Sequence, residues 1–223
     1  MLISELLYII SKYGPLLLEG LKTTFIITLI SYFIGFVGGI SIAITRTFLH
    51  KALKVFAHIY VELFRGTPML VQLFFVYYAL PEMGIRFDPI LSSIIAIGLN
   101  SAAYQSEYIR SALSSIPYAE IEAAYSIGLT RFGAMLYIAL PQAVRIAIPT
   151  LTNEAIYLFK YSSIAYFVTA PELMYMGKLV ATQTFLYVEV YTVLAIIYVI
   201  FSIVLSGIAR YIEKKLQIPG YIV

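Results

Sequence analysis

The chain has 223 residues, 61% of them hydrophobic and 12% charged, and its mean hydropathy is +0.89. A soluble domain carries about 25% charged residues, so this composition excludes a soluble fold and indicates an integral membrane protein. The net charge of +3, without a basic run, argues against nucleic-acid binding. Because the sequence has no cysteine, and His50 and His58 lack a matching carboxylate pattern, we expect no metal site and no thiol catalysis.

Uncharged runs of about 20 residues favour membrane-spanning helices over the short alternating strands of a barrel. We therefore predict an all-α membrane protein with about five transmembrane helices in a single domain, residues 15–215. An interfacial segment at 1–14 is expected to end at Gly14-Pro15, and a tail follows at 216–223. The predicted spans are residues 16–46, 55–80, 89–112, 142–168 and 190–209.

The second span contains the sequence ELFRGTP. Glu62 and Arg65 share a helix face and can neutralise each other, while Gly66 and Pro68 predict a kink or local unwinding. Two interpretations stay open. The segment is either a structural kink with a paired charge, or a hinge or gate made of Arg65, Gly66, Thr67 and Pro68.

Polar residues of the third span need partners, because an unpaired charge at membrane depth costs about 2.5–3.5 kcal/mol. Glu107 is therefore expected near the cytoplasmic interface and paired with Arg110. Asn100 is expected to face the bundle interior, and Gln105 to serve helix packing. Small residues also predict close packing of the first span: Gly35, Gly38 and Gly39.

Residues 117–128, after the third span, predict a short capped helix. Pro117 fits a first helical turn, and Glu120 and Glu122 lie near the N-terminus, where the helix dipole favours negative charge. Gly128 can end this helix in a left-handed conformation, and Thr130 can cap the next one. The small side chains of this helix allow close approach by another protein: Ala123 and Ala124.

The fourth span, interrupted early by Pro149, is unusually polar in its middle. Glu154 and Lys160 are about 9 Å apart along a regular helix axis, so they cannot pair directly. Such polarity predicts a binding site, and two separated opposite charges suit a zwitterionic ligand. The alternative is that each charge pairs with another helix. The predicted substrate contacts are Asn100, Asn153, Glu154, Lys160, Ser162 and Ser163.

Residues 170–189 are expected to leave the membrane, with Pro171-Glu172 starting a short surface helix. Five spans place the termini on opposite sides, and the excess of Lys and Arg on one side predicts its orientation. The N-terminus is expected outside, and residues 117–128 and the C-terminus in the cytoplasm. The basic residues on the cytoplasmic side would be Arg46, Lys51, Lys54, Arg110, Arg131, Arg210, Lys214 and Lys215.

The stretch from Glu122 to Pro141 resembles the EAA loop of bacterial ABC-importer membrane subunits. Its fixed positions are Glu122, Ala123, Ala124, Gly128, Ile138, Leu140 and Pro141. Segments at 65–81, 100–117 and 140–154 resemble those of polar-amino-acid importers. At 158–164 the likeness continues, although Tyr161 stands where many relatives carry Asp.

This resemblance implies the type I importer fold in a bacterial cell membrane, the inner membrane where there are two. Two permease subunits would bind two ATPase subunits, and an extracytoplasmic binding protein would deliver a polar or charged amino acid. The helix at 117–128 would couple to the ATPase through Glu120, Glu122, Ala123, Ala124 and Gly128. ATP and Mg²⁺ would bind the partner ATPase, whereas this chain would hold no cofactor. The resemblance chooses neither the amino acid nor between an identical and a related second permease.

Two rival functions are less consistent with the sequence. An ion-coupled secondary carrier could use Glu154 and Glu107 as protonation sites, but it would need an internal repeat, which we do not find. An intramembrane enzyme would need a catalytic constellation, and Ser162 has no matching base. The chain also lacks a GxxxxGK[ST] phosphate loop, so we expect a transport subunit that is not itself an enzyme and has no catalytic residues.

Overall fold

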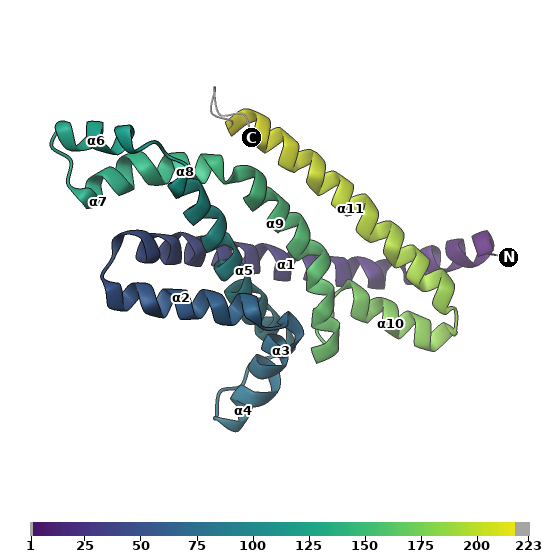
Figure 1. Cartoon of the computed structure of the whole chain (residues 1–223). Coiled ribbons are helices and arrows are strands. Elements are labelled where there is room, and N and C mark those ends of the chain that lie inside the picture. Colours follow the sequence, from purple (N-terminus) through teal and green to yellow (C-terminus); the bar gives the residue numbers. More distant parts are fainter. Residues whose placement is uncertain (1, 217–223) are drawn as a thin grey trace. The chain divides into compact units, whose positions relative to one another are not determined.

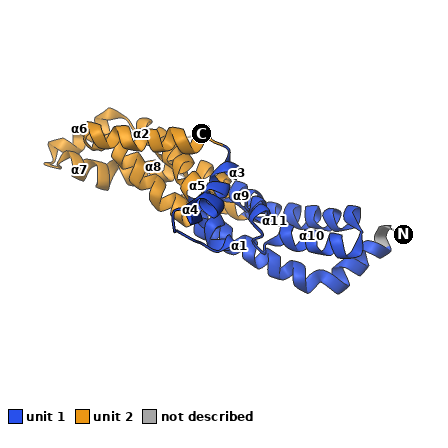
Figure 2. Cartoon of the chain, turned by 90° about the horizontal axis from the view of Figure 1, so that it is seen from below, with its two compact units in different colours: residues 1–32, 68–98, 155–207 blue, residues 33–67, 99–154, 208–223 orange. Residues whose placement is uncertain are grey.

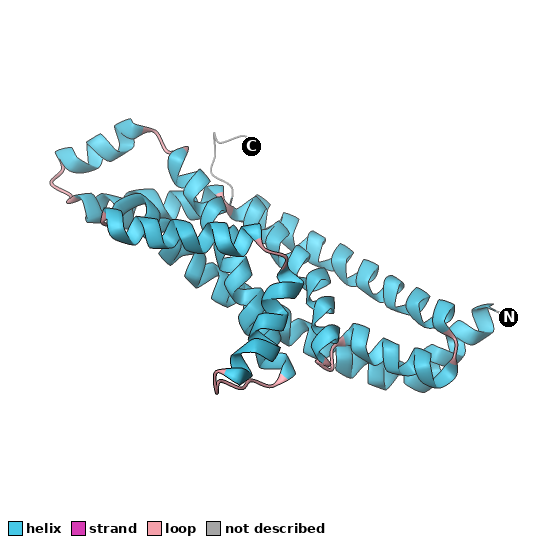
Figure 3. Cartoon of the chain, turned by 60° about the horizontal axis from the view of Figure 1, so that its bottom comes forward, coloured by secondary structure: helices cyan, strands magenta, loops and turns pink. Residues whose placement is uncertain are grey.

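The computed structural model describes residues 2–216, and all regular structure within this range is helical (Figures 1 and 3). The prediction of an all-α protein is therefore confirmed. The predicted tail, residues 216–223, lies outside the described residues except for its first. In chain order the elements are α1 (Leu2–Phe48), α2 (Lys51–Gly66), α3 (Met69–Phe74), the π-helical turn η1 (Phe75–Ala79), α4 (Leu80–Glu82), α5 (Pro89–Ser114), α6 (Tyr118–Ser126), α7 (Arg131–Ala134), the π-helical turn η2 (Met135–Ala139), α8 (Leu140–Ile146), α9 (Ile148–Tyr161), the 3-10 helix η3 (Ser162–Val168), α10 (Leu173–Thr184) and α11 (Tyr187–Leu216).

The chain divides into two compact units, shown in blue and orange in Figure 2. Unit 1 consists of residues 1–32, 68–98 and 155–207, and unit 2 of residues 33–67, 99–154 and 208–223. Four long helices, α1, α5, α9 and α11, contribute residues to both units. Each unit therefore draws its core from segments that are far apart in the sequence.

Within the described residues, two helices are long and apolar enough to cross a bilayer, Ser4–Phe48 and Tyr187–Leu216. Two further candidate spans are bent pairs: α2 continues into Met69–Glu82 across a bend of 107°, and Arg131–Ile146 continues into Ile148–Val168 across a bend of 55°. The first bend confirms the break predicted at Gly66–Pro68. α5 covers the predicted third span, and the total of five spans stays a prediction.

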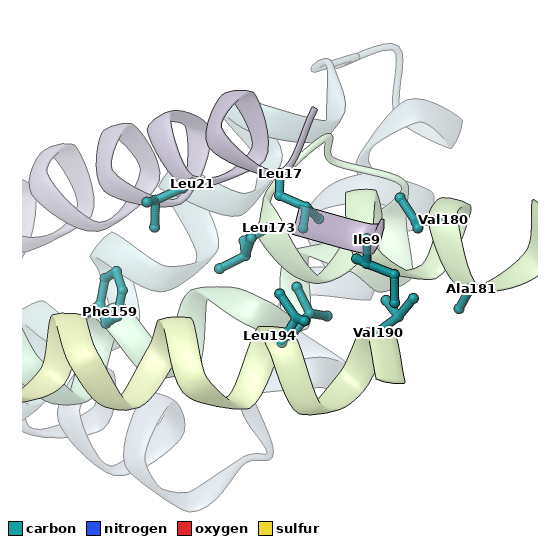
Figure 4. Packing of buried hydrophobic residues seen from close by; sticks show 10 residues of the cluster. Ile9, Leu17, Leu21, Phe159, Leu173, Val180, Ala181, Val190 and Leu194 are labelled. Carbon is teal, nitrogen blue, oxygen red and sulfur yellow. The ribbon is translucent and has the colours of Figure 1, made fainter. Parts of the chain in front are cut away.

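The expected break at Gly14-Pro15 is wrong, because α1 runs through Pro15 without interruption. A proline inside a helix removes one backbone hydrogen bond and crowds the preceding turn. Tertiary packing offsets this cost, since Ile9 and Leu17, on either side of the proline, are both buried in the same apolar cluster (Figure 4).

The break expected at Pro149 lies two residues earlier, at Ala147 between α8 and α9. Pro149 is the second residue of α9, where its missing N–H leaves no bond unmade. A proline disfavours the α conformation in the residue before it and crowds the carbonyl four residues back, which favours a helix break just before Pro149.

Both π-helical turns are followed by the same dipeptide, Leu-Pro. The Leu80 N–H donates to the carbonyl of Phe75, and the Leu140 N–H donates to that of Met135, each five residues back. The wider turn holds one extra residue just before the proline. In this way each helix continues past a residue that would otherwise disrupt it.

The apolar core of unit 1 brings α10 against α1 and α11 (Figure 4). A Cβ added at Gly177 of α10 would overlap the Leu194 side chain of α11, so glycine allows the two helices to approach closely here. The helix expected to start at Glu172 is confirmed; it buries one face in this cluster, while Lys178, Thr182 and Gln183 are exposed, and its place at the membrane surface stays a prediction. The buried members of the cluster are Ile9, Leu17, Leu21, Phe159, Leu173, Val180, Ala181, Val190, Val193 and Leu194.

Glu172 is a fully buried carboxylate that caps α10 and ties it to two other helices. It accepts backbone N–H bonds from Met174 at 2.9 Å and Tyr175 at 2.8 Å, and hydroxyl bonds from Thr24 and Tyr198, both at 3.4 Å. Burial raises the pKa of this carboxyl to about 7. The four hydrogen-bond donors favour the charged form and lower the pKa, but burial has the larger effect. The side chain therefore joins α1, α10 and α11 at one point.

Replacing this carboxylate should loosen unit 1. We expect Glu172→Ala to destabilise the protein by about 2–4 kcal/mol, because it removes a helix cap and leaves buried hydroxyls without an acceptor. The rate of thermal inactivation in detergent would measure the effect. Glu82→Ala, which alters an exposed carboxylate, is the matched control. Equal inactivation rates for the two variants would contradict the assigned role.

Candidate functional site

The capping of α6 agrees with the sequence prediction. Gly128 has φ of +87°, and its N–H donates to the Tyr125 carbonyl at 2.9 Å, while the Leu129 N–H reaches back to Ala124 at 3.1 Å. These two bonds form a glycine-dependent helix end. The Thr130 hydroxyl then accepts the Gly133 N–H at 3.1 Å and starts α7. Residue 117, predicted inside the first turn, is instead the N-cap of α6.

The residues predicted for coupling divide between the two sides of α6. Glu122, Ala123 and Gly128 are exposed, whereas Ala124 is 3% exposed and packs inward. The Glu120 carboxylate accepts a hydrogen bond from the Gln142 amide of α8 at 2.5 Å, so it fastens α6 to the helix that follows. Large apolar side chains are exposed around α6, as at a protein-docking surface: Tyr118, Ile127, Phe132 and Tyr137.

Glu154, on α9, is the buried carboxylate of unit 2. The Ser101 hydroxyl donates to its Oε1 atom at 2.7 Å, and the Tyr108 hydroxyl donates to Oε2 at 3.2 Å. Both donors are neutral, and none of the ion pairs in the part of the chain that the structure describes includes Glu154. Glu154 therefore does bond to another helix, α5, as the sequence-based alternative expects, but through two neutral side chains and not through an ion pair.

The other predicted substrate residues of α9 and η3 have different environments. Asn153 and Lys160 are exposed, and their spacing of seven places them on one side of α9. The Ser162 hydroxyl donates to the Phe159 carbonyl at 2.8 Å, so it serves the start of η3. Ser163 is half-buried. Tyr161 stacks on Tyr157, with ring centroids 4.9 Å apart.

Asn100 lies on α5 and is half-buried in unit 2. Its amide donates to the Phe64 carbonyl of α2 at 2.9 Å, which places it inside the helix bundle as predicted and gives it a bond between helices. It also lies next to Ser101, a residue that the sequence analysis did not select. Ser101 and Tyr108 carry no motif, and only their position opposite Glu154 reveals their role.

The glycines of α1 pack closely against α5, as predicted. A Cβ at Gly35 would lie 2.5 Å from the Gln105 amide nitrogen and 2.7 Å from the Ser101 hydroxyl. A Cβ at Gly39 would meet the Cβ of Gln105 at 2.8 Å. The packing role expected of Gln105 is therefore confirmed, and the same contact holds Ser101 in place beside Glu154.

Glu107 pairs with Arg110, as predicted, at 2.7 Å, and it also pairs with Arg46. The expected pair between Glu62 and Arg65 is wrong. Arg65 lies 4.0 Å from the Glu107 carboxylate, while Glu62 lies 3.9 Å from the His58 ring. The Glu107 side chain, on α5, is 17% exposed, whereas that of Glu62 is 65% exposed, so the charge of Glu107 is less screened by water. Arg65 thus has a partner distant in sequence, whereas Glu62 has another partner on its own helix.

Comparisons with known proteins agree with these features. Residues 35–218 match the family described as "Binding-protein-dependent transport system inner membrane component". The chain is 37% identical over 201 residues to the probable amino-acid ABC transporter permease protein YckA of Bacillus subtilis, covering 90% of this chain and 89% of the relative. It is 38% identical over 209 residues to the putative glutamine transport system permease protein GlnP of Rickettsia bellii, and this match covers 92% of this chain and 96% of the relative.

Among solved structures, a chain in the crystal structure of an amino acid ABC transporter with histidines matches with a TM-score of 0.86 at 32% identity. The match covers 92% of this chain and 96% of that one. The agreement in length and fold extends over nearly all of the described helices.

The contact between α1 and α5 can be tested with two glycines of one helix. Gly35→Ala should destabilise the protein by about 1–3 kcal/mol, because the new methyl group displaces Ser101 or Gln105. Gly14→Ala, where nothing lies within 4 Å, should be neutral or stabilising by up to about 1 kcal/mol. Thermal inactivation of the purified protein measures both. Similar losses in the two variants would contradict close packing at Gly35.

Proposed function

The chain belongs to the family of inner membrane components of binding-protein-dependent transport systems, as the permease subunit of an amino-acid ABC importer, and we propose how it moves its substrate. The subunit is a transport component and not an enzyme. The observation that carries the proposed mechanism is the short helix α6, which is capped at its end and surrounded by exposed apolar side chains.

We propose that the subunit lies in the bacterial cytoplasmic membrane with α6 and its C-terminus in the cytoplasm. Two permease subunits, identical or related, would assemble with two ATPase subunits that bind ATP and Mg²⁺. A binding protein outside the membrane would deliver the amino acid. The positive charges in the last turns of α1 and α11 support this orientation, and family membership supports the ATPase and the binding protein.

Coupling in this mechanism is a free energy passed between subunits. When the ATPase subunits close on ATP, they push on α6 through the surface of Glu122, Ala123 and the apolar residues around them. α6 transmits the movement because its end is fixed by Gly128 and its N-terminal half is fastened to α8 through Glu120. α5, which precedes α6 in the chain, and α8, to which α6 is fastened, then move. The segment Arg65–Pro68 opens or closes the pathway as a gate.

We propose that Glu154 binds the ammonium group of the amino acid. The supporting observation is a buried carboxylate that has two neutral donors and, within residues 2–216, no cationic partner. A positive charge bound there would balance the buried negative charge. Lys160 and Asn153, on one exposed side of the same helix, would bind the carboxylate. Asn100, Ser162 and Ser163 would complete the polar lining. An ion-coupled carrier is not favoured, because the relatives are subunits of ABC transporters.

The coupling role of α6 makes a direct prediction. Gly128→Ala should reduce uptake and substrate-stimulated ATP hydrolysis at least about fivefold, because a left-handed backbone at an L-residue distorts the end of α6. Uptake and ATPase assays in proteoliposomes with the complete importer would measure this. Gly84→Ala is the control, because Gly84 has φ of +83°, lies in open space and is outside α6. If both variants behave alike, α6 has no special role.

The substrate role of Glu154 makes another prediction. Glu154→Gln should raise the KM for amino-acid uptake at least about tenfold, since the amide keeps the shape but removes the charge that pairs with ammonium. Glu19→Gln, on an exposed part of α1, is the control. A panel of histidine, glutamine, arginine and glutamate in uptake assays would identify the side-chain preference. An unchanged KM for all of them would remove Glu154 from the site.

A further inference from the structure

Glu107 lies at the centre of a charge cluster within unit 2. Its Oε1 atom pairs with Arg46 near the end of α1, and its Oε2 atom accepts two hydrogen bonds from Arg110, at 2.7 and 3.2 Å. Arg65, in the last turn of α2, is the third arginine, with its Nη1 atom 4.0 Å from Oε2. The Glu107 carboxylate therefore joins three helices. It forms hydrogen-bonded ion pairs with Arg46 and Arg110, while Arg65 lies at the distance limit of an ion pair.

The last two turns of α2 lie along α5 through further contacts. The Tyr60 hydroxyl donates to the Leu99 carbonyl at 2.6 Å, and the Asn100 amide donates to the Phe64 carbonyl. One turn further along α5, the Arg65 guanidinium lies over the Tyr104 ring, 5.3 Å from its centroid. The end of α2 is thus attached to the half of α5 that leads into α6.

Arg65 has the weakest hold on this cluster and the closest connection to the bend. It precedes Gly66, where α2 ends, and Pro68, after which the chain turns by 107°. Its side chain is 41% exposed, compared with 14% for Arg46. Breaking the partly exposed ion pair of Arg65, at 4.0 Å, costs less free energy than breaking the more buried pair of Arg46.

We infer that Glu107 is a positioning residue that couples the gate to α6, by holding the end of α2 through Arg65 to the part of α5 that precedes α6. Movement of α6 shifts Glu107 together with α5, and Arg65 transmits the shift to the bend at Gly66–Pro68. Arg46 and Arg110 keep the carboxylate charged and aligned throughout the cycle. This inference rests on the proposed importer function.

The test uses the complete importer in proteoliposomes, and it exploits the absence of cysteine from this chain, so that labelling of this subunit reports only on an introduced thiol. Val71→Cys, at an exposed residue of α3 just beyond the bend, reports on the gate through its rate of labelling by a membrane-impermeant thiol reagent. In this background we expect nucleotide trapping to change the labelling rate. Glu107→Gln and Arg65→Gln should each reduce this change about tenfold and lower uptake per ATP hydrolysed, while ATP hydrolysis continues.

Two further variants separate positioning from simple destabilisation. Glu107→Asp, which keeps the charge, should restore part of the response, and Glu62→Gln, an exposed carboxylate of α2, should leave it unchanged. Arg65→Gln leaves the pairs of Glu107 with Arg46 and Arg110 intact, so it gives the answer even if Glu107→Gln fails to assemble. A full nucleotide response in Arg65→Gln would overturn the inference. If an importer assembled with the unaltered chain showed no ATP-driven uptake, the proposed function itself would be rejected.

Discussion

The structure depends on the requirement that every charge placed between helices must find a partner away from water. Glu172 meets it with four neutral donors, and Glu107 meets it with arginines from three helices. Glu154 meets it only in part, with two hydroxyl groups. The first two arrangements hold helices together. The third has only two neutral donors, and we propose that a ligand supplies the balancing positive charge there.

Features that depend on local backbone chemistry could be predicted from the sequence. The left-handed Gly128, the cap at Thr130 and the bend at Gly66–Pro68 follow from what glycine, threonine and proline permit within a few residues. The same reasoning was wrong at Pro15, because burial of apolar residues on both sides stabilises α1 by more than the proline costs. Local backbone preferences therefore predicted the ends and bends of helices correctly, but they failed at Pro15, where tertiary packing decides the structure.

Contacts between distant segments could not be predicted in this way. Arg46 and Glu107 are 61 residues apart, and Ser101 and Glu154 are 53 apart. No pattern in the sequence distinguishes Ser101 from the other serines of α5. The mistaken pairing of Glu62 with Arg65 has the same origin, since helix spacing allowed the pair but the fold offered Arg65 a less exposed carboxylate. The sequence thus indicated which residues needed partners, and the fold determined which partners they found.

The two π-helical turns have a consequence for the direction in which later side chains point. Each inserts one residue before a Leu-Pro pair, and an inserted residue rotates everything that follows by about 100° around the helix axis. The faces of α4 and α8 are therefore out of phase with those of the helices before them. If a helix of 3.6 residues per turn were assumed straight through Ala79 or Ala139, the side chains after that residue would be placed on the wrong face of the helix. The buried face of the chain therefore changes direction at both π-helical turns.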